Sequence, residues 1–167
     1  IAQGLAANLG QPVVVDNRAG NVAISAQAAM KAQPDGYTFY ITSQVIWLAP
    51  LLVPNVPYDV LRDFVPVTLA TRSPNSLIVH PSVAANSVKE FIAVAKSKPG
   101  ELNYTSGATG STSHLAGELF NSLAGVKLVR IAYKNGSQQI ADLLAAQVHL
   151  TFSSLSGMED YIKTGKL

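Results

Sequence analysis

The fold class follows from one stretch of the sequence, Leu102-Asn103-Tyr104-Thr105-Ser106-Gly107-Ala108-Thr109-Gly110-Ser111-Thr112. Residues 102–105 predict a short strand, and residues 106–111 form a polar loop rich in glycine and hydroxyl side chains. Residues 112–124 predict a helix, because apolar side chains recur at helical spacing and Gly125 follows as a C-cap. A strand, a glycine-containing loop and a helix in this order indicate an α/β fold.

The same alternation extends along the rest of the chain's second half. Strands are predicted at 77–80, 102–105, 127–132 and 148–152. Helices are predicted after them in turn, at 87–97, 112–124, 137–145 and 156–164. This order predicts a nearly complete doubly wound unit.

The part of the chain before residue 75 is less regular. Strands are predicted at 13–15, 37–42 and 67–71, a turn at 16–20, and a helix from residue 21 or 25 to residue 33. Residues 50–66 contain prolines at 50, 54, 57 and 66, which favours an irregular path with at most a helical turn or two. The first residues resemble the second half of a helix, so we expect a missing N-terminus.

Composition excludes several classes of protein. The 167 residues are 48% hydrophobic and 13% charged, which indicates a folded chain rather than a disordered one. The longest apolar runs are far shorter than the ~20 residues that a membrane helix needs. The net charge is +2 and the basic residues are scattered, so nucleic acid is not an expected partner. The absence of cysteine excludes disulfides, Cys-ligated zinc and a thiol nucleophile.

The loop at 106–111 has the features of an anion-binding site. It opens a helix, and the first turn of a helix presents unpaired N–H groups with about half a positive charge. Glycines allow a close approach of the main chain, and hydroxyl side chains add donors. The loop contains no Lys or Arg, which argues against a triphosphate and for a carboxylate. A capped helix after a tight turn, without a ligand, is the alternative interpretation.

The histidines leave alternatives open. His114 lies in the first turn of the predicted helix, where it could line a pocket or be satisfied by local polar groups. With Ser111 it suggests a serine-dependent hydrolase, but no acidic orienting residue lies nearby and G-x-S-x-G is absent. His80 and His149 stand alone in predicted strands, so no metal site is expected.

Several motifs occur in a characteristic order. They are Gln11-Pro12-Val13-Val14-Val15-Asp16-Asn17-Arg18, Pro34-Asp35-Gly36-Tyr37-Thr38, Asp63-Phe64-Val65-Pro66-Val67, Pro99-Gly100-Glu101-Leu102-Asn103-Tyr104 and Gly110-Ser111-Thr112-Ser113-His114-Leu115-Ala116-Gly117-Glu118-Leu119-Phe120. This set resembles the substrate-binding proteins of tripartite tricarboxylate transporters, the TctC type or Bordetella uptake gene family. The resemblance spans essentially the whole chain, and the last motif is its most specific piece.

The resemblance implies an α/β fold of the periplasmic-binding-protein type II kind, with two doubly wound lobes. The first lobe, over residues 1–73, is expected to be incomplete, and the second, over residues 74–167, nearly complete. Family members are considerably longer than this chain. It therefore looks like a piece that lacks the N-terminal strand and loop and the C-terminal segment.

The resemblance also implies which residues would contact a solute. The expected contacts are Ser43 and Gln44 in the first lobe, Ser106, Gly107, Ala108, Thr109, Gly110, Ser111 and His114 in the second, and Ser153 and Ser154 in the loop after residue 152. Gln44 stands where the family usually has Asn, and the Asp that many members carry near Ser153 is absent. Residues 20–22 also depart from the family's glycine-richer turn. These departures bear on the identity of the solute.

The function implied by the resemblance is capture of a small carboxylate, such as a di- or tricarboxylate, by a periplasmic solute-binding protein of a tripartite transporter. The implied partners are the solute and the membrane components of that transporter, and neither enzymatic activity nor a cofactor is expected. Two alternatives stay open. One is the serine-dependent hydrolase, and the other is a truncated homologue that no longer binds and self-associates through an exposed sheet edge.

Overall fold

The computed structural model describes residues 1–18 and 21–167. The chain forms two compact units, Ile1–Arg72 and Ser73–Leu167, and each is described by itself. The predicted turn at 16–20 and the departure at 20–22 lie partly outside the described residues.

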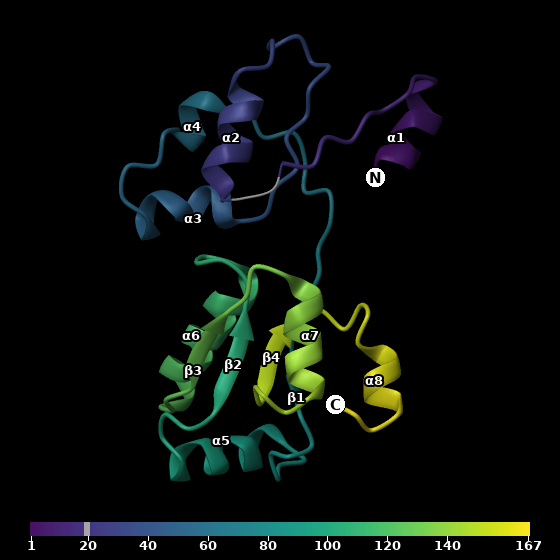
Figure 1. Ribbon diagram of the computed structural model, residues 1–167. Coiled ribbons are helices and arrows are strands. Elements are labelled where there is room, and N and C mark those ends of the chain that lie inside the picture. Colours follow the sequence, from purple (N-terminus) through teal and green to yellow (C-terminus); the bar gives the residue numbers. More distant parts are fainter. Residues whose placement is uncertain (19–20) are drawn as a thin grey trace. The chain divides into compact units, whose positions relative to one another are not determined.

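The second unit is a four-stranded sheet with helices on both faces (Figure 1). Its elements are β1 (Ser76–Val79), α5 (Val88–Ser97), β2 (Asn103–Ser106), α6 (Thr112–Ala124), β3 (Val129–Ala132), α7 (Gly136–Leu144), β4 (Leu150–Ser153) and α8 (Glu159–Lys163). The strand order is β1-β4-β2-β3. β2 runs parallel to β3 and to β4, whereas β1 is antiparallel to β4. The predicted alternation of strands and helices is confirmed, and the sheet is mixed because of this antiparallel edge strand.

The side chains of β2 and β4 alternate between the two faces of the sheet. Tyr104 and Phe152 point to the face covered by α5 and α6, where Phe91 and Phe120 complete an aromatic cluster with centroid distances of 5.6 to 6.0 Å. Thr105 and Thr151 alternate to the other face, beneath α7. The core of the unit therefore lies on the α5 and α6 side, and a polar strip lies under α7.

The first unit contains helices only, among the residues that the structure describes. They are α1 (Ala2–Leu9), α2 (Val22–Met30), α3 (Val45–Leu52) and α4 (Val60–Asp63). Its small core consists of Ala26, Ile46, Tyr58 and Val60. The helix predicted from residue 21 or 25 to residue 33 ends earlier than expected, because α2 ends at Met30.

The strands predicted at 13–15, 37–42 and 67–71 are wrong. Most apolar side chains of these segments are exposed, with 88% for Val14, 91% for Tyr37 and 73% for Val67, although Val13 and Tyr40 are half-buried. A strand needs a neighbouring strand to take up its N–H and C=O groups. In the described part of the unit no neighbouring strand pairs with these segments. They therefore form no sheet, although their residues have the composition of strands.

The proline-rich stretch is more helical than predicted. Helix α3 contains Pro50, which has no N–H to donate to the carbonyl of Ile46 one turn earlier. The hydroxyl of Tyr58 donates to that carbonyl at 3.0 Å and replaces the lost helical hydrogen bond. Burial raises the pKa of this tyrosine, so the hydroxyl keeps its proton. A partner distant in sequence therefore makes Pro50 tolerable.

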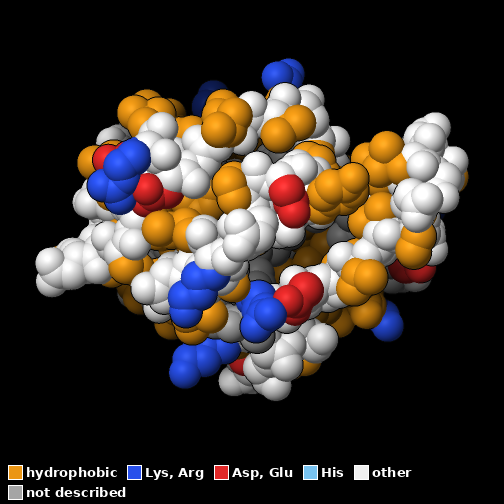
Figure 2. Space-filling model, turned by 90° about the horizontal axis from the view of Figure 1, so that it is seen from above, with side chains coloured by type: hydrophobic (Ala, Val, Ile, Leu, Met, Phe, Trp, Pro, Cys, Tyr) orange, Lys and Arg blue, Asp and Glu red, His pale blue; other side chains and the backbone are white. Residues whose placement is uncertain are grey.

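Hydrophobic side chains are exposed over much of the first unit. Figure 2 shows that hydrophobic side chains on the face seen from above form separate groups, with Lys, Arg, Asp and Glu side chains between them. Among the described helices, none has the length and the hydropathy that crossing a bilayer requires.

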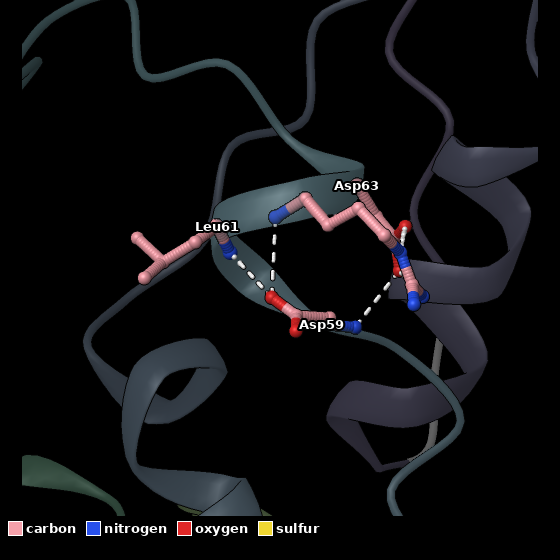
Figure 3. Close-up of polar contacts among 4 residues, drawn as sticks. Asp59, Leu61 and Asp63 are labelled. Atoms are coloured by element: carbon pink, nitrogen blue, oxygen red, sulfur yellow. Dashed lines mark hydrogen bonds and ion pairs between the residues drawn. The ribbon is translucent and has the colours of Figure 1, made fainter.

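The short helix α4 is stabilised by reciprocal capping (Figure 3). Asp59 accepts hydrogen bonds from the N–H groups of Leu61 and Arg62 at 3.0 and 3.1 Å. Asp63 accepts from the N–H of Asp59 at 2.8 Å, and its pairing with Arg62 lowers the pKa of its carboxyl group. The N-terminal amides of this four-residue helix are thereby satisfied by side chains of the helix itself and of its N-cap.

Candidate functional site

A cavity of about 340 Å³ lies at the carboxyl end of the second unit's parallel strands. Its lining residues are Ser73, Asn75, Gly107, Thr112, Ser113, Gln139, Phe152, Ser153 and Ser154. In parallel α/β sheets, ligands gather outside the carboxyl ends of strands. The loops after β2 and β3 lead to α6 and α7, which lie on opposite faces of the sheet (Figure 1). The cavity volume is in the range of small-molecule pockets.

The loop between β2 and α6 is held by hydrogen bonds of its own. Ser111 is the N-cap of α6, and its Oγ accepts a hydrogen bond from the N–H of His114 at 3.3 Å. Gly110 has a φ of 84°, which side chains rarely allow, and its N–H donates to Nδ1 of His114 at 3.1 Å. The N–H of Gly107 donates to Oγ of Ser113 at 3.2 Å. The N–H of Ser111 donates to the carbonyl of Ala108 at 3.0 Å, so four amides of this segment are occupied by the protein's own groups.

Two amides at the start of α6 are not used in this way. The N–H groups of Thr112 and Ser113 donate no hydrogen bond to any acceptor in the described residues. Both residues line the cavity, and Thr112 is exposed. The first N–H groups of a helix point out of its N-terminus and carry the positive end of its dipole. The exposed loop residues Ala108 and Thr109 also donate no main-chain hydrogen bond in the described residues, but Thr112 and Ser113 are the ones that line the cavity.

Arg130 lies against the same loop, although no basic residue occurs within the loop itself. From β3, its Nε donates to Oγ of Ser106 at 2.6 Å and its Nη2 to the carbonyl of Gly107 at 2.9 Å. Its Nη1 donates to Oγ1 of Thr109 at 3.2 Å. Within the described chain it forms no salt bridge. The guanidinium therefore fixes the shape of the loop and adds a positive charge next to it.

The sequence pattern missed Arg130 as a site residue. Its signal was a charged side chain in the middle of the predicted strand at 127–132, where an apolar residue is expected. The pairing of Tyr104 with Arg130 in the parallel register of β2 and β3 brings the side chain to the β2 loop. The loop itself contains no basic residue, as the sequence indicates, but the structure places the guanidinium of Arg130 beside it.

The Ser111 and His114 pair does not have the geometry of a nucleophile and its base. Nδ1 of His114 accepts from the Gly110 amide, and no hydrogen bond in the described residues joins Ser111 Oγ to the imidazole ring. Burial, and then the charge of Arg130, lower the pKa of His114. The imidazole is therefore neutral at pH 7, with its proton on Nε2.

The other residues predicted to contact a solute lie in the cavity wall, in the buried interior or in the exposed loop. Gly107, Ser153 and Ser154 line the cavity. Ser106 is fully buried, and its hydroxyl faces Arg130 and the Gly107 carbonyl. Ala108 and Thr109 are exposed in the loop.

Ser43 and Gln44 belong to the first unit. Ser43 is exposed, and Gln44 is the N-cap of α3 without a capping hydrogen bond from its side chain. Contact of these two residues with a solute stays a prediction, as it does for the residues of the second unit.

The position of α6 on the sheet depends on a close contact. A Cβ atom at Gly117 would lie 2.3 Å from Cε2 of Tyr104, so only glycine lets the helix approach this ring. The hydroxyl of Tyr104 donates to Oε1 of Glu118 at 2.6 Å. Burial and this hydrogen bond raise the pKa of Tyr104. The start of α6, and with it the free amides, is positioned by this contact.

Gln139 is a second residue that the sequence pattern missed. It lies in α7, lines the cavity and donates from Nε2 to Thr105 and Thr151 on the sheet. A single polar residue on a helix surface carries no signal in sequence. In the described residues, no group of three or more His, Cys, Asp or Glu side chains could hold a metal ion.

Comparison with known proteins identifies relatives over the whole chain. The family described as the tripartite tricarboxylate transporter family receptor, TctC, matches residues 1–167. Protein BugT of Bordetella pertussis is 36% identical over 100% of this chain and 52% of its own length. A UPF0065 protein from the tcbD-tcbE intergenic region of Pseudomonas sp. is 34% identical over 97% of this chain and 48% of its own. The chain thus spans about half the length of these relatives.

Solved structures show the same fold. Rpa4515 of R. palustris, with adipate, has a TM-score of 0.88 and 37% identity, covering 99% of this chain and 56% of that one. MatC from Rhodopseudomonas palustris, with bound malate, has a TM-score of 0.81 and 25% identity over 99% of this chain and 57% of that one. The predicted α/β class of a periplasmic binding protein is confirmed by these similarities.

Proposed function

Because the chain belongs to the family of tripartite tricarboxylate transporter receptors, we propose that it captures a small carboxylate in the cavity at the start of α6. The observation that carries this proposal is the pair of unpartnered amides of Thr112 and Ser113. Two similar proteins are described with adipate and with malate, which are both dicarboxylates. A di- or tricarboxylate is therefore the solute class that we assign.

The chemistry of the cavity supports an anion of modest charge. A carboxylate oxygen at the helix N-terminus would accept from the two amides and from the hydroxyls of Thr112 and Ser113. Arg130 adds a positive charge beside the loop, yet its guanidinium is engaged with the loop through three donors. The carboxylate is thus held by main-chain amides at the positive end of the helix dipole and by hydroxyl groups. The charge of Arg130 supports this binding from beside the loop without direct contact.

The wider role follows from the family. We propose that the protein delivers its solute to the membrane components of a tripartite transporter, that it acts in the periplasm and that it catalyses no reaction. The capping role of the Ser111 hydroxyl and the acceptor role of His114 Nδ1 support binding over serine-dependent hydrolysis.

The proposal is tested by deleting one amide without changing the helix. Thr112 is the first residue of α6, where proline is favoured, and Ser111 has a ψ of 159°, which suits a residue before proline. Thr112→Pro removes the N–H and the hydroxyl, whereas the control Thr112→Ala removes only the hydroxyl. Titration calorimetry with succinate, adipate, malate and citrate measures binding to each form.

We expect at least one of these acids to bind the unmodified chain. We expect Thr112→Pro to weaken that binding about tenfold more than Thr112→Ala does, the equivalent of one charge-assisted hydrogen bond. Equal binding by the proline and alanine variants would remove the amides from the site. Failure of every acid to bind would reject carboxylate capture.

A further inference from the structure

We propose that Gln139 is a specificity-determining residue of the cavity, whose side-chain carbonyl recognises a hydroxyl group on the bound acid. This inference rests on the proposed capture of a carboxylate in the same cavity. It assigns to the site a preference between acids that differ only in a hydroxyl group.

The amide of Gln139 is held in one place by two buried threonines. Thr105 of β2 and Thr151 of β4 are paired across the parallel register, and both are fully buried. Nε2 of Gln139 donates to Oγ1 of Thr105 at 2.7 Å and to Oγ1 of Thr151 at 3.1 Å. Both hydrogens of the NH₂ group are therefore used at the sheet surface.

The carbonyl end of the same amide has no hydrogen-bond partner in the described residues. Gln139 lines the cavity together with Gly107, Thr112 and Ser113, and its Oε1 accepts no hydrogen bond in the described residues. The main-chain groups that face this space at the start of α6 are donors, which suit a carboxylate. Oε1 is an acceptor, and its direction is fixed because Nε2 is anchored.

An acceptor in this position selects for a particular solute. A carboxylate oxygen carries no proton and cannot donate to Oε1. Close contact between these two acceptor oxygens is therefore unfavourable. A hydroxyl group on the carbon chain of the acid can donate to Oε1 while the carboxylate accepts from Thr112 and Ser113. An acid that lacks the hydroxyl leaves Oε1 desolvated and unpaired, which costs binding energy.

Gln139 also connects α7 to the sheet, and this purely structural role makes a different prediction. A structural role uses Nε2 alone, so its loss changes stability and leaves the choice between acids unchanged. Recognition uses Oε1, so its loss changes the ratio of two affinities. Acid pairs that differ by one hydroxyl, succinate with malate and propionate with lactate, report this ratio directly.

The experiment is titration calorimetry of both pairs on the full chain. We expect the unmodified protein to bind the hydroxyl-bearing member of at least one pair about tenfold more tightly. In Gln139→Leu this ratio should fall to about one, because no acceptor remains. Gln139→Glu is the second variant, to be used if the leucine variant does not fold. It keeps the link between α7 and the sheet, because the threonine hydroxyls can donate to one carboxylate oxygen. That variant should bind every acid more weakly because of its charge, and keep the preference for the hydroxyl.

The matched control is Thr105→Val with Thr151→Val, which removes the anchoring hydroxyls and keeps the amide. We expect an intermediate ratio, because Oε1 is present but free to rotate. Equal affinities for both members of each pair in the unmodified protein, or an unchanged ratio in Gln139→Leu, would overturn the role of Gln139 while carboxylate capture stands. Absence of binding to all four acids would overturn the role of Gln139, and absence of binding to adipate and citrate as well would overturn carboxylate capture.

Discussion

Replacement of Gly117 by alanine tests the contact that positions the start of α6. Alanine in a helix interior is ordinarily about 1 kcal/mol more favourable than glycine. Here the new Cβ would lie 2.3 Å from Cε2 and 2.4 Å from Cζ of Tyr104. Carbon atoms pack at about 3.5 Å or more, so the ring or the helix must move by about 1 Å.

The surroundings do not allow this movement without loss. Tyr104 has no exposed surface, and its ring packs at 6.0 Å from that of Phe152. Overpacking of a core costs about 1–3 kcal/mol, and displacement of the hydroxyl from Glu118 adds about 1 kcal/mol. After subtraction of the gain in helix propensity, we expect Gly117→Ala to destabilise the second unit by about 2 kcal/mol. In a unit of this size this corresponds to a lower Tm by roughly 10 °C.

Urea unfolding followed by far-UV circular dichroism, with amide hydrogen exchange of β2, measures this loss. Gly136→Ala is the matched control, because a Cβ there meets nothing within 4 Å and Gly136 is also helical. We expect the control to be neutral or slightly stabilising. An equally neutral or stabilising Gly117→Ala would refute the argument that this glycine is required by Tyr104.

Three further perturbations test other parts of the structure. Tyr58→Phe should destabilise the first unit by about 1–3 kcal/mol in urea unfolding, because the carbonyl of Ile46 loses its donor; an unchanged midpoint would contradict this. Arg130→Lys keeps the charge but not the planar fork, so we expect carboxylate affinity to fall about tenfold in calorimetry, and wild-type affinity would show that charge alone suffices. Burial lowers the pKa of His149, so the unfolded chain takes up the proton first, near pH 6.5, and stability should fall from pH 7 to pH 5. His149→Asn, which keeps an acceptor for the N–H of Asn103, should make this fall in melting temperature smaller, and an identical pH profile would exclude His149 as the cause.

The second unit could be predicted from its sequence because its signals are local. Ser87 and Ser111 are N-caps, Gly125 is a left-handed C-cap, and α6 has the predicted bounds. Each of these features depends on residues within a few positions of each other along the chain. The same locality explains why the glycine and hydroxyl loop was recognised as a helix N-terminus.

The first unit shows the limit of local patterns. Residues 13–15 and 37–42 have the composition of strands, but strand formation depends on a partner segment that the local sequence does not specify. The helix at Val45–Leu52 was missed because Pro50 normally breaks a helix, and its tolerance depends on Tyr58. In both cases the deciding partner is not adjacent in the chain.

The sequence by itself determined the α/β class, the family and the place of the anion loop at the start of a helix. The structure was needed to show which amides of that loop are engaged, since those of Gly107 and Gly110 donate to side chains of α6 six and four positions further along the chain. It also brought Arg130 and Gln139 to the loop and the cavity from β3 and α7. The physical reason is that the register of parallel strands and the packing of helices join residues that lie more than twenty positions apart, as the pairs Arg130–Gly107 and Gln139–Thr105 show.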